Sequence, residues 1–194
     1  MDAKAVSIRF FHRLYKRGVI SEDNVEVCAF GFQRLLIFLL NVSTYLIIGL
    51  MLDMILESLI FILAYSPLRM FAGGYHAKSP VVCYFLGIPL FISVLLLQTI
   101  AVQHSLPFIA LGIIAALIIA RIAPVESPSK PLDDMETRVY GKITKLILRV
   151  EVLLAVALFF MGWVVVAMAV VVPVTLLCLL LLFGKLMESD YLRA

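Results

Sequence analysis

The stretch "SPVVCYFLGIPLFISVLLLQTIAVQHSLPFIALGIIAALIIA", residues 79–120, contains no Asp, Glu, Lys or Arg. A helix needs about 20 apolar residues to cross the hydrocarbon core of a bilayer, so this run is long enough for two crossings. A second uncharged run extends from Val152 to Gly184 and suffices for two more if one crossing borrows upstream residues. The two runs predict an all-α, polytopic membrane protein.

The composition agrees with a bilayer as the main solvent. Of the 194 residues, 63% are hydrophobic and 15% are charged, whereas a soluble domain is about half apolar and about a quarter charged. The net charge of +3 gives no basis for expecting a nucleic-acid partner. The three cysteines lack zinc or disulfide spacing, and at least one thiol must stay free.

We expect one membrane-embedded domain over residues 1–194, with about six transmembrane helices. The predicted spans are residues 33–52, 54–68, 82–102, 106–123, 145–165 and 167–184. If the N-terminus is cytoplasmic, all 16 Lys and Arg fall in cytoplasmic parts or at their membrane edges. This is the positive-inside pattern, and it puts both termini in the cytoplasm.

Two boundaries in this scheme leave alternatives. Only 11 uncharged residues separate Glu57 from Arg69, so the second span must include acidic residues, thin the bilayer or be re-entrant. The last break is placed at Gly162-Trp163, although Pro173 could kink one long helix instead.

The N-terminal segment, residues 1–32, is basic and amphipathic. Apolar residues recur at helical spacing, at Ala5, Ile8, Phe11 and Tyr15, among five Lys and Arg residues. This pattern indicates a helix lying on an anionic membrane surface, or a flank that only sets the topology. A second helix is expected to start at "SEDN", with Ser21 as its N-cap.

Between the second and third predicted spans lies "SPLRMFAGGYHAKSPVVCYF", residues 66–85, which is rich in polar and reactive groups. Ser79 suits an N-cap and Pro80 the first helical position, which puts Cys83 at the end of the first turn. The positive end of a helix dipole there favours a thiolate, the nucleophilic form of cysteine. The alternative is that Cys83 is a small buried hydrophobe.

His76 lies seven residues before Cys83, which on one continuous helix would separate their Cα atoms by about 10.5 Å. A general base must come within about 3 Å of its proton, so a working pair requires a break in the helix. Gly73 and Gly74 permit a sharp turn. A Cys–His pair is the minimal activated nucleophile for acyl transfer; the alternative is an interfacial His76 bonded to a carbonyl.

Arg69 and Lys130 are candidate substrate contacts, together with Gly73 and Gly74. Glycines allow close approach of a substrate backbone, and Arg69 offers a bidentate fork for a carboxylate. Arg69 could equally be a positive-inside anchor. Lys130 could meet an acidic substrate, although a solvated loop is the default interpretation.

The segment "PLRMFAGGYHAKSPVVC", residues 67–83, closely resembles the Arg, Gly-Gly-Tyr-His-Ala and Cys signature of the accessory gene regulator B family of bacterial membrane peptidases. "SPSKPL", residues 127–132, resembles that family's Lys-Pro-Leu loop. The length, the six hydrophobic segments and the basic N-terminus match as well, so the resemblance covers the whole chain. Here Met70 and Phe71 stand where the family often has further basic residues, and Lys130 stands alone where several lysines can be adjacent.

The resemblance implies a thiol protease of the bacterial cell membrane, with its active site on the cytoplasmic side. Its substrate would be a short amphipathic quorum-sensing propeptide, cut and held as a thioester, then closed to a thiolactone or lactone autoinducing peptide. Carried over, Cys83 is the nucleophile and His76 the general base. Arg69 and Gly74 match positions that matter for activity.

Two other functions remain as alternatives. A small peptide transporter or exporter could use the motif as a broken-helix substrate site, and it would need neither the thiol nor the imidazole. An intramembrane metallopeptidase is disfavoured because the three histidines lie far apart and no HExxH motif occurs; we expect no metal and no cofactor. Small residues on one span, Gly112, Ala115 and Ala116, suit helix contacts and leave a homodimer open.

Overall fold

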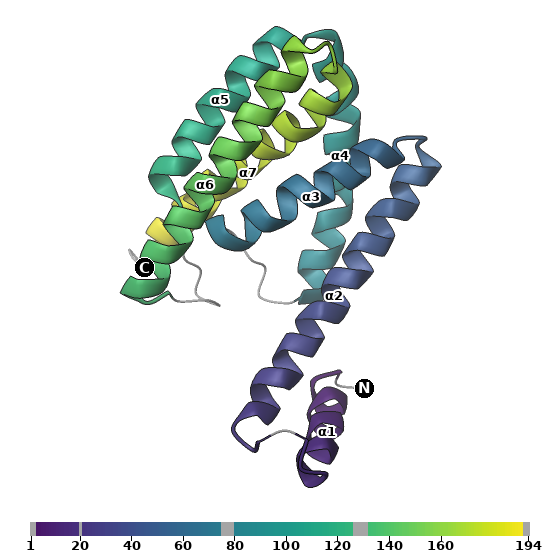
Figure 1. Ribbon diagram of the computed structural model, residues 1–194, viewed down its shortest axis with the longest axis vertical. Coiled ribbons are helices and arrows are strands. Elements are labelled where there is room, and N and C mark those ends of the chain that lie inside the picture. Colours follow the sequence, from purple (N-terminus) through teal and green to yellow (C-terminus); the bar gives the residue numbers. More distant parts are fainter. Residues whose placement is uncertain (1–2, 20, 75–79, 126–131, 192–194) are drawn as a thin grey trace. The chain divides into compact units, whose positions relative to one another are not determined.

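The computed structural model describes residues 3–19, 21–74, 80–125 and 132–191, which form seven helices (Figure 1). In chain order these are α1 (Ala3–Lys16), α2 (Asn24–Met51), α3 (Ile55–Ala72), α4 (Pro80–Gln103), α5 (Ser105–Ile122), α6 (Asp134–Phe160) and α7 (Val164–Tyr191). The chain divides into two compact units, residues 1–44 and 45–194, and each is described by itself.

Five helices, α2, α3, α4, α5 and α7, are long and apolar enough to cross a bilayer. Large apolar side chains also face outward, as at Leu63, Leu106 and Leu153, which are 73%, 70% and 70% exposed. Water disfavours an apolar surface of this extent, whereas lipid tails solvate it. The prediction of an all-α, polytopic membrane protein is therefore confirmed. The predicted span over residues 145–165, which falls mostly in α6, is not among these five helices.

In the first unit, α1 has the predicted amphipathic pattern. Ile8, Phe11 and Tyr15 are half-buried while the basic residues between them are exposed. The Nε2 atom of Gln33 donates to Oγ of Ser7 at 2.5 Å, which joins α1 to α2. The predicted start of the second helix, at the residue after Ser21, is wrong by two residues. It begins at Asn24, and Ser21 contributes only its carbonyl, which accepts from the Asn24 N–H.

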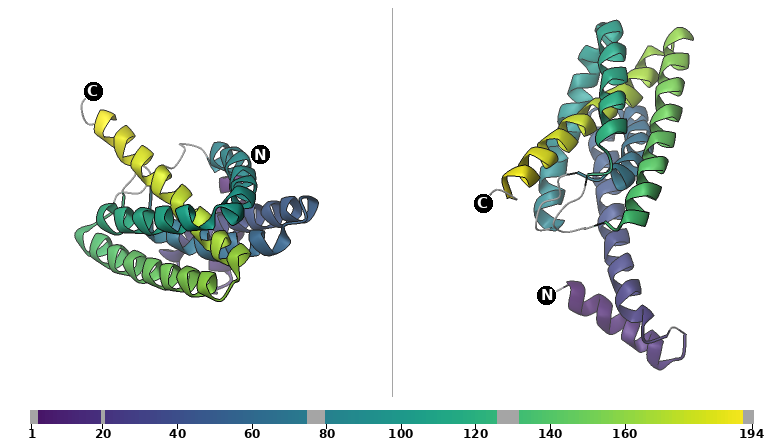
Figure 2. Two further views of the ribbon diagram at one scale, coloured as in Figure 1. Left: turned by 90° about the horizontal axis from the view of Figure 1, so that it is seen from above. Right: turned by 90° about the vertical axis from the view of Figure 1, so that its left-hand side faces the viewer.

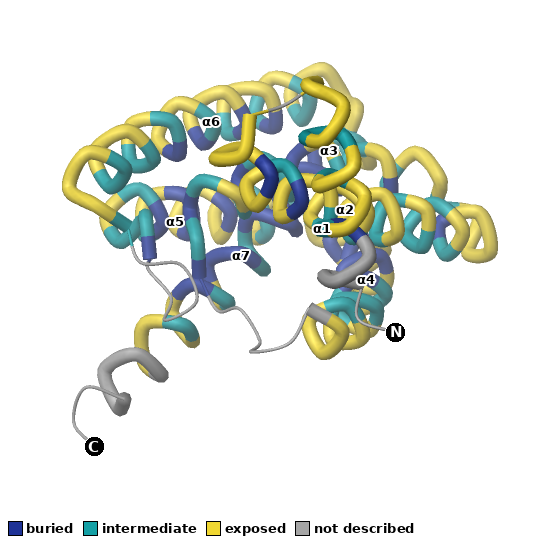
Figure 3. Tube along the Cα trace, turned by 90° about the horizontal axis from the view of Figure 1, so that it is seen from below, coloured by how far each residue is buried: buried dark blue, intermediate teal, exposed yellow. Residues whose placement is uncertain are grey.

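In the second unit, α7 is the central helix. It packs against α3, α4, α5 and α6 and carries much of the buried surface seen in Figure 3. Helices α5 and α6 run alongside each other, and α7 passes obliquely against them (Figure 2). Its buried face supplies both halves of the core: Met168, Val171 and Val172 to one, and Val174, Leu177, Cys178 and Leu181 to the other.

Helix α3 resolves part of the question about the second span. It has 18 residues and includes Glu57 in its first turn and Arg69 in its last. The helix therefore gains length by taking in charged residues at both ends, one of the three alternatives. It runs four residues beyond the predicted end and stops at Ala72, next to Gly73.

Helix α6 begins at Asp134, eleven residues before the predicted span over residues 145–165, so the connection that precedes it is shorter than expected. The cause is a capping box, which the hydropathy pattern does not reveal. Oδ1 of Asp133 accepts from the Glu136 N–H at 2.6 Å, and Oε2 of Glu136 accepts from the Asp133 N–H at 3.2 Å. These bonds satisfy two N–H groups that a helix start leaves free.

The predicted break at Gly162-Trp163 is confirmed. Helix α6 ends at Phe160, α7 begins at Val164, and Gly162 has a φ of +83°. Helix α7 continues through Pro173, so this proline does not separate two helices.

Candidate active site

The glycine pair of the motif forms a turn that ends α3. Gly73 and Gly74 have φ values of +75° and +106°, a region that other residues rarely adopt. The turn is held by Val125, which follows α5. The Gly74 N–H donates to the Val125 carbonyl at 3.1 Å, and the Val125 N–H donates to the Ala72 carbonyl at 2.9 Å. The fold thus joins the motif to the start of the loop that contains "SPSKPL".

Arg69 lies beneath this turn. Its Nη1 donates to the Gly73 carbonyl at 2.9 Å, and a Cβ atom on Gly74 would lie 2.6 Å from the same Nη1. The guanidinium therefore fixes the shape of the glycine turn. A contact between Arg69 and substrate stays a prediction.

We expect Arg69→Gln to loosen the turn. Loss of a charge-assisted hydrogen bond should speed hydrogen exchange at the Gly74 amide by about tenfold or more. The measurement is exchange followed by mass spectrometry on the purified protein in detergent. Lys185→Gln, which removes an exposed cation elsewhere, serves as the control. Unchanged exchange at Gly74 in Arg69→Gln would contradict this role.

Helix α4 begins at Pro80, as predicted, and Cys83 lies in its first turn. The three thiols differ in access: Cys83 is exposed, Cys28 is half-buried and Cys178 is buried. The first N–H groups of a helix have no partner within the helix. The exposed thiol of Cys83 therefore lies beside backbone N–H groups that can donate hydrogen bonds.

Two tyrosines outside the sequence motif lie near Arg69 and Cys83. Tyr65 of α3 lies within electrostatic range of both Arg69 and Cys83. Tyr45, in the last two turns of α2, lies within the same range of Tyr65 and Cys83. Its ring stacks on Phe91, with the ring centroids 4.3 Å apart. Arg69, Tyr65 and Cys83 thus belong to one region of the second unit. In the sequence, the only hint of these two residues is that each is a tyrosine within an apolar span.

Two predicted residues lie outside the described part of the chain. His76 falls within residues 75–79 and Lys130 within residues 126–131. The pairing of His76 with Cys83 and the role of Lys130 stay predictions. Among the described residues, no three His, Cys, Asp or Glu side chains come together as metal ligands.

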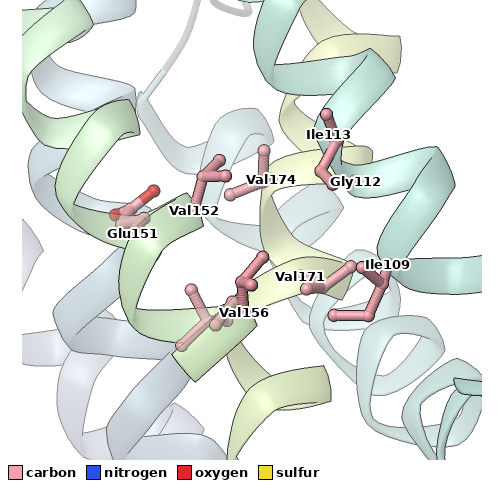
Figure 4. Close-up of a pocket in the computed structure, with 10 residues that line it drawn as sticks. Ile109, Gly112, Ile113, Glu151, Val152, Val156, Val171 and Val174 are labelled. Carbon is pink, nitrogen blue, oxygen red and sulfur yellow. The ribbon is translucent and has the colours of Figure 1, made fainter. Parts of the chain in front are cut away.

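An open pocket lies elsewhere in the bundle, between α5, α6 and α7 (Figure 4). Its walls are apolar apart from Glu151, which is only 7% exposed. The Oε2 atom of Glu151 is buried and has no hydrogen-bond partner among the described residues. None of the described motif residues, Cys83 included, lines this pocket.

Glu151→Leu should stabilise the protein. A buried carboxyl without a full set of partners costs free energy, and an apolar side chain of similar size removes that cost, by about 1–3 kcal/mol. Thermal unfolding in detergent should show a higher midpoint for Glu151→Leu than for Glu151→Gln, which keeps a polar group. A lower midpoint for both variants would mean that Glu151 has a partner.

Comparisons with known proteins agree with the motif. The family model described as accessory gene regulator B matches residues 7–186. An AgrB-like protein of Clostridium perfringens (strain SM101 / Type A) is 28% identical over 168 residues, covering 78% of each chain. Accessory gene regulator protein B of Staphylococcus intermedius is 26% identical over 123 residues, 62% of this chain and 64% of that protein. No solved structure matches. With a family match over most of its length, the chain belongs to the accessory gene regulator B family.

Proposed function

We propose that the protein is an integral membrane cysteine endopeptidase that cleaves an autoinducer propeptide and promotes its cyclisation. The observation that carries the proposal is the exposed Cys83 in the first turn of α4. Membership of the family, which implies a part in accessory gene regulation and quorum sensing, supports it.

In the proposed cleavage, His76 takes the proton of the Cys83 thiol, and Sγ attacks the carbonyl carbon of the scissile bond. The oxyanion accepts hydrogen bonds from the backbone N–H groups of Val82 and Cys83 in the first turn of α4. The C–N bond then breaks, and the amine leaves with the proton from His76. The acyl fragment stays on Sγ as a thioester.

In the proposed cyclisation, a thiol or hydroxyl within the peptide attacks the thioester carbonyl. The C–S bond breaks, and Cys83 leaves as a thiolate that takes up the proton of the incoming group. No ATP is needed because a thioester is already activated. A nucleophile held close can reach an effective molarity of about 10⁵ M, and exclusion of water favours ring closure over hydrolysis.

The proposed substrate is a short amphipathic propeptide, and the proposed site faces the cytoplasm at the bacterial cell membrane. If α6 crosses in addition to the five apolar helices, the six crossings would put both chain ends on that side. Arg69, Gly73 and Gly74 are the proposed contacts for a peptide backbone or carboxylate, and Lys130 is the proposed contact for an acidic group.

The test is co-expression with a candidate propeptide encoded nearby, followed by mass spectrometry of the intact protein and of the peptides. We expect a propeptide fragment attached to the protein, released by neutral hydroxylamine as a thioester should be, and a cyclic product. Intact propeptide moved across the membrane, with no adduct and no cleavage, would support the transporter instead.

A further inference from the structure

Helix α6 carries four cations in a line on one of its faces. Arg138, Lys142, Lys145 and Arg149 follow one another at spacings of four, three and four residues, and all four are exposed. At about 100° per residue these positions fall within about 60° of one another around the helix axis. We call these four residues the basic stripe. Figure 3 shows the exposed outer side of α6.

The stripe has no anionic partner in the part of the chain that the structure describes. Among the residues that the structure describes, none of the four cations makes an ion pair or a side-chain hydrogen bond. Asp133 and Glu136, at the start of α6, are engaged in the capping box. An anion from outside the chain can therefore supply the counter-charge.

Contacts between α5 and α6 show how far along α5 the basic stripe extends, which we call its depth. A Cβ atom on Gly141 would lie 3.5 Å from Cδ of Pro124, just past the end of α5. Glu151 shares its pocket with Gly112 and Ile113, halfway along α5. Lys142 is therefore level with the end of α5, and Arg149 is about 10 Å further along, beside the apolar length of that helix.

This depth distinguishes the stripe from a solvated charged face. Helix α5 is long and apolar enough to cross the membrane, and a crossing α5 would put Lys145 and Arg149 beside hydrocarbon. Their long side chains can extend back toward the membrane boundary, where phosphates lie. Exposed apolar residues adjoin the stripe: Leu146 and Val150 are 59% and 57% exposed. A cationic line beside an apolar strip matches a lipid with an anionic headgroup and acyl chains.

We propose that the basic stripe of α6 is a binding site for anionic phospholipid. The phosphate lies among Lys142, Lys145 and Arg149, and the acyl chains cover Leu146 and Val150. Arginine and lysine both bind phosphate oxygens, arginine in a bidentate manner. A soluble acidic peptide fits less well because it cannot follow the stripe into hydrocarbon. The proposal is independent of the peptidase chemistry.

The test uses the purified full-length protein in detergent and palmitoyl-oleoyl phosphatidylglycerol as the probe, with phosphatidylcholine for comparison. Bound lipid is counted by native mass spectrometry. Lys145→Gln with Arg149→Gln should weaken phosphatidylglycerol binding by about tenfold or more. The matched control, Arg121→Gln with Lys185→Gln, removes two exposed cations outside the stripe and should leave binding unchanged. Lys145→Arg with Arg149→Lys keeps the charge and should retain binding, which separates lost charge from misfolding.

Three results would overturn the proposal. Equal weakening in the control would show diffuse attraction to the whole surface. Equal binding of phosphatidylcholine would show that only acyl chains are recognised. Displacement of the lipid by a soluble hexaglutamate peptide or by inorganic phosphate would assign the stripe to a soluble anion.

Discussion

Cys83→Ala should abolish cleavage of the propeptide, with a fall in rate of about 10³-fold or more, because it removes the attacking sulfur. His76→Ala should have a similar effect because the two residues act as a unit. The measurement is the amount of cleaved peptide formed on co-expression, at equal levels of membrane-inserted protein.

The chain provides its own controls for Cys83. Cys28 is half-buried in α2 and Cys178 is buried in α7, so both thiols are less accessible than that of Cys83. Cys28→Ala and Cys178→Ala should keep cleavage near the wild-type level. Full cleavage by Cys83→Ala would exclude the covalent mechanism, and loss of cleavage in all three variants would point to a general effect on the fold.

Gly73→Ala should be the most destabilising of the glycine substitutions. The φ of +75° disfavours any side chain, and the added Cβ would collide with the Val125 carbonyl oxygen. Strain and collision together should cost about 3 kcal/mol. The hydrogen bonds between Val125 and the glycine turn also set the shape of the turn next to Arg69. Cleavage should therefore fall as well. Thermal unfolding in detergent measures the first effect and the propeptide assay the second.

Gly162→Ala separates the two contributions. Gly162 has a similar φ of +83°, yet nothing lies within 4 Å of a Cβ atom placed there. Its substitution should cost only the backbone strain, about 1–2 kcal/mol. If Gly73→Ala and Gly162→Ala lower the unfolding midpoint equally, the contact with Val125 adds nothing.

Most helix positions could be predicted because they depend on local sequence. Pro80 fixes the start of α4, and hence Cys83 in its first turn, since proline fits the first helical position and disfavours helix before it. Gly162 follows the end of α6 for a different reason, since glycine adopts its φ of +83° without strain. Helix α6 began earlier than predicted because hydropathy identified its apolar half only, while the capping box at Asp133 and Glu136 defines its start.

The candidate site was predictable only in part. The motif indicated Cys83 and the glycine turn, but Tyr45 and Tyr65 enter the site from two other helices. The residues that surround Tyr45 and Tyr65 depend on how the helices pack, which the sequence motif does not contain. Glu151 went unnoticed because a single acidic residue in an apolar run does not reveal whether it faces lipid or the bundle.

By itself, the sequence determined that this is a polytopic helical membrane protein with a nucleophile candidate at a helix start. Each conclusion depends on a single stretch of the chain. The membrane spans follow from comparing the length of the uncharged runs with the thickness of a bilayer. The helix start follows from Pro80, because proline fits the first helical position. Only the tertiary structure decided that Val125 closes the glycine turn, that Glu151 is buried, and that the cations of α6 lie beside the apolar length of α5. Each of these depends on residues far apart in the sequence, which packing alone brings together.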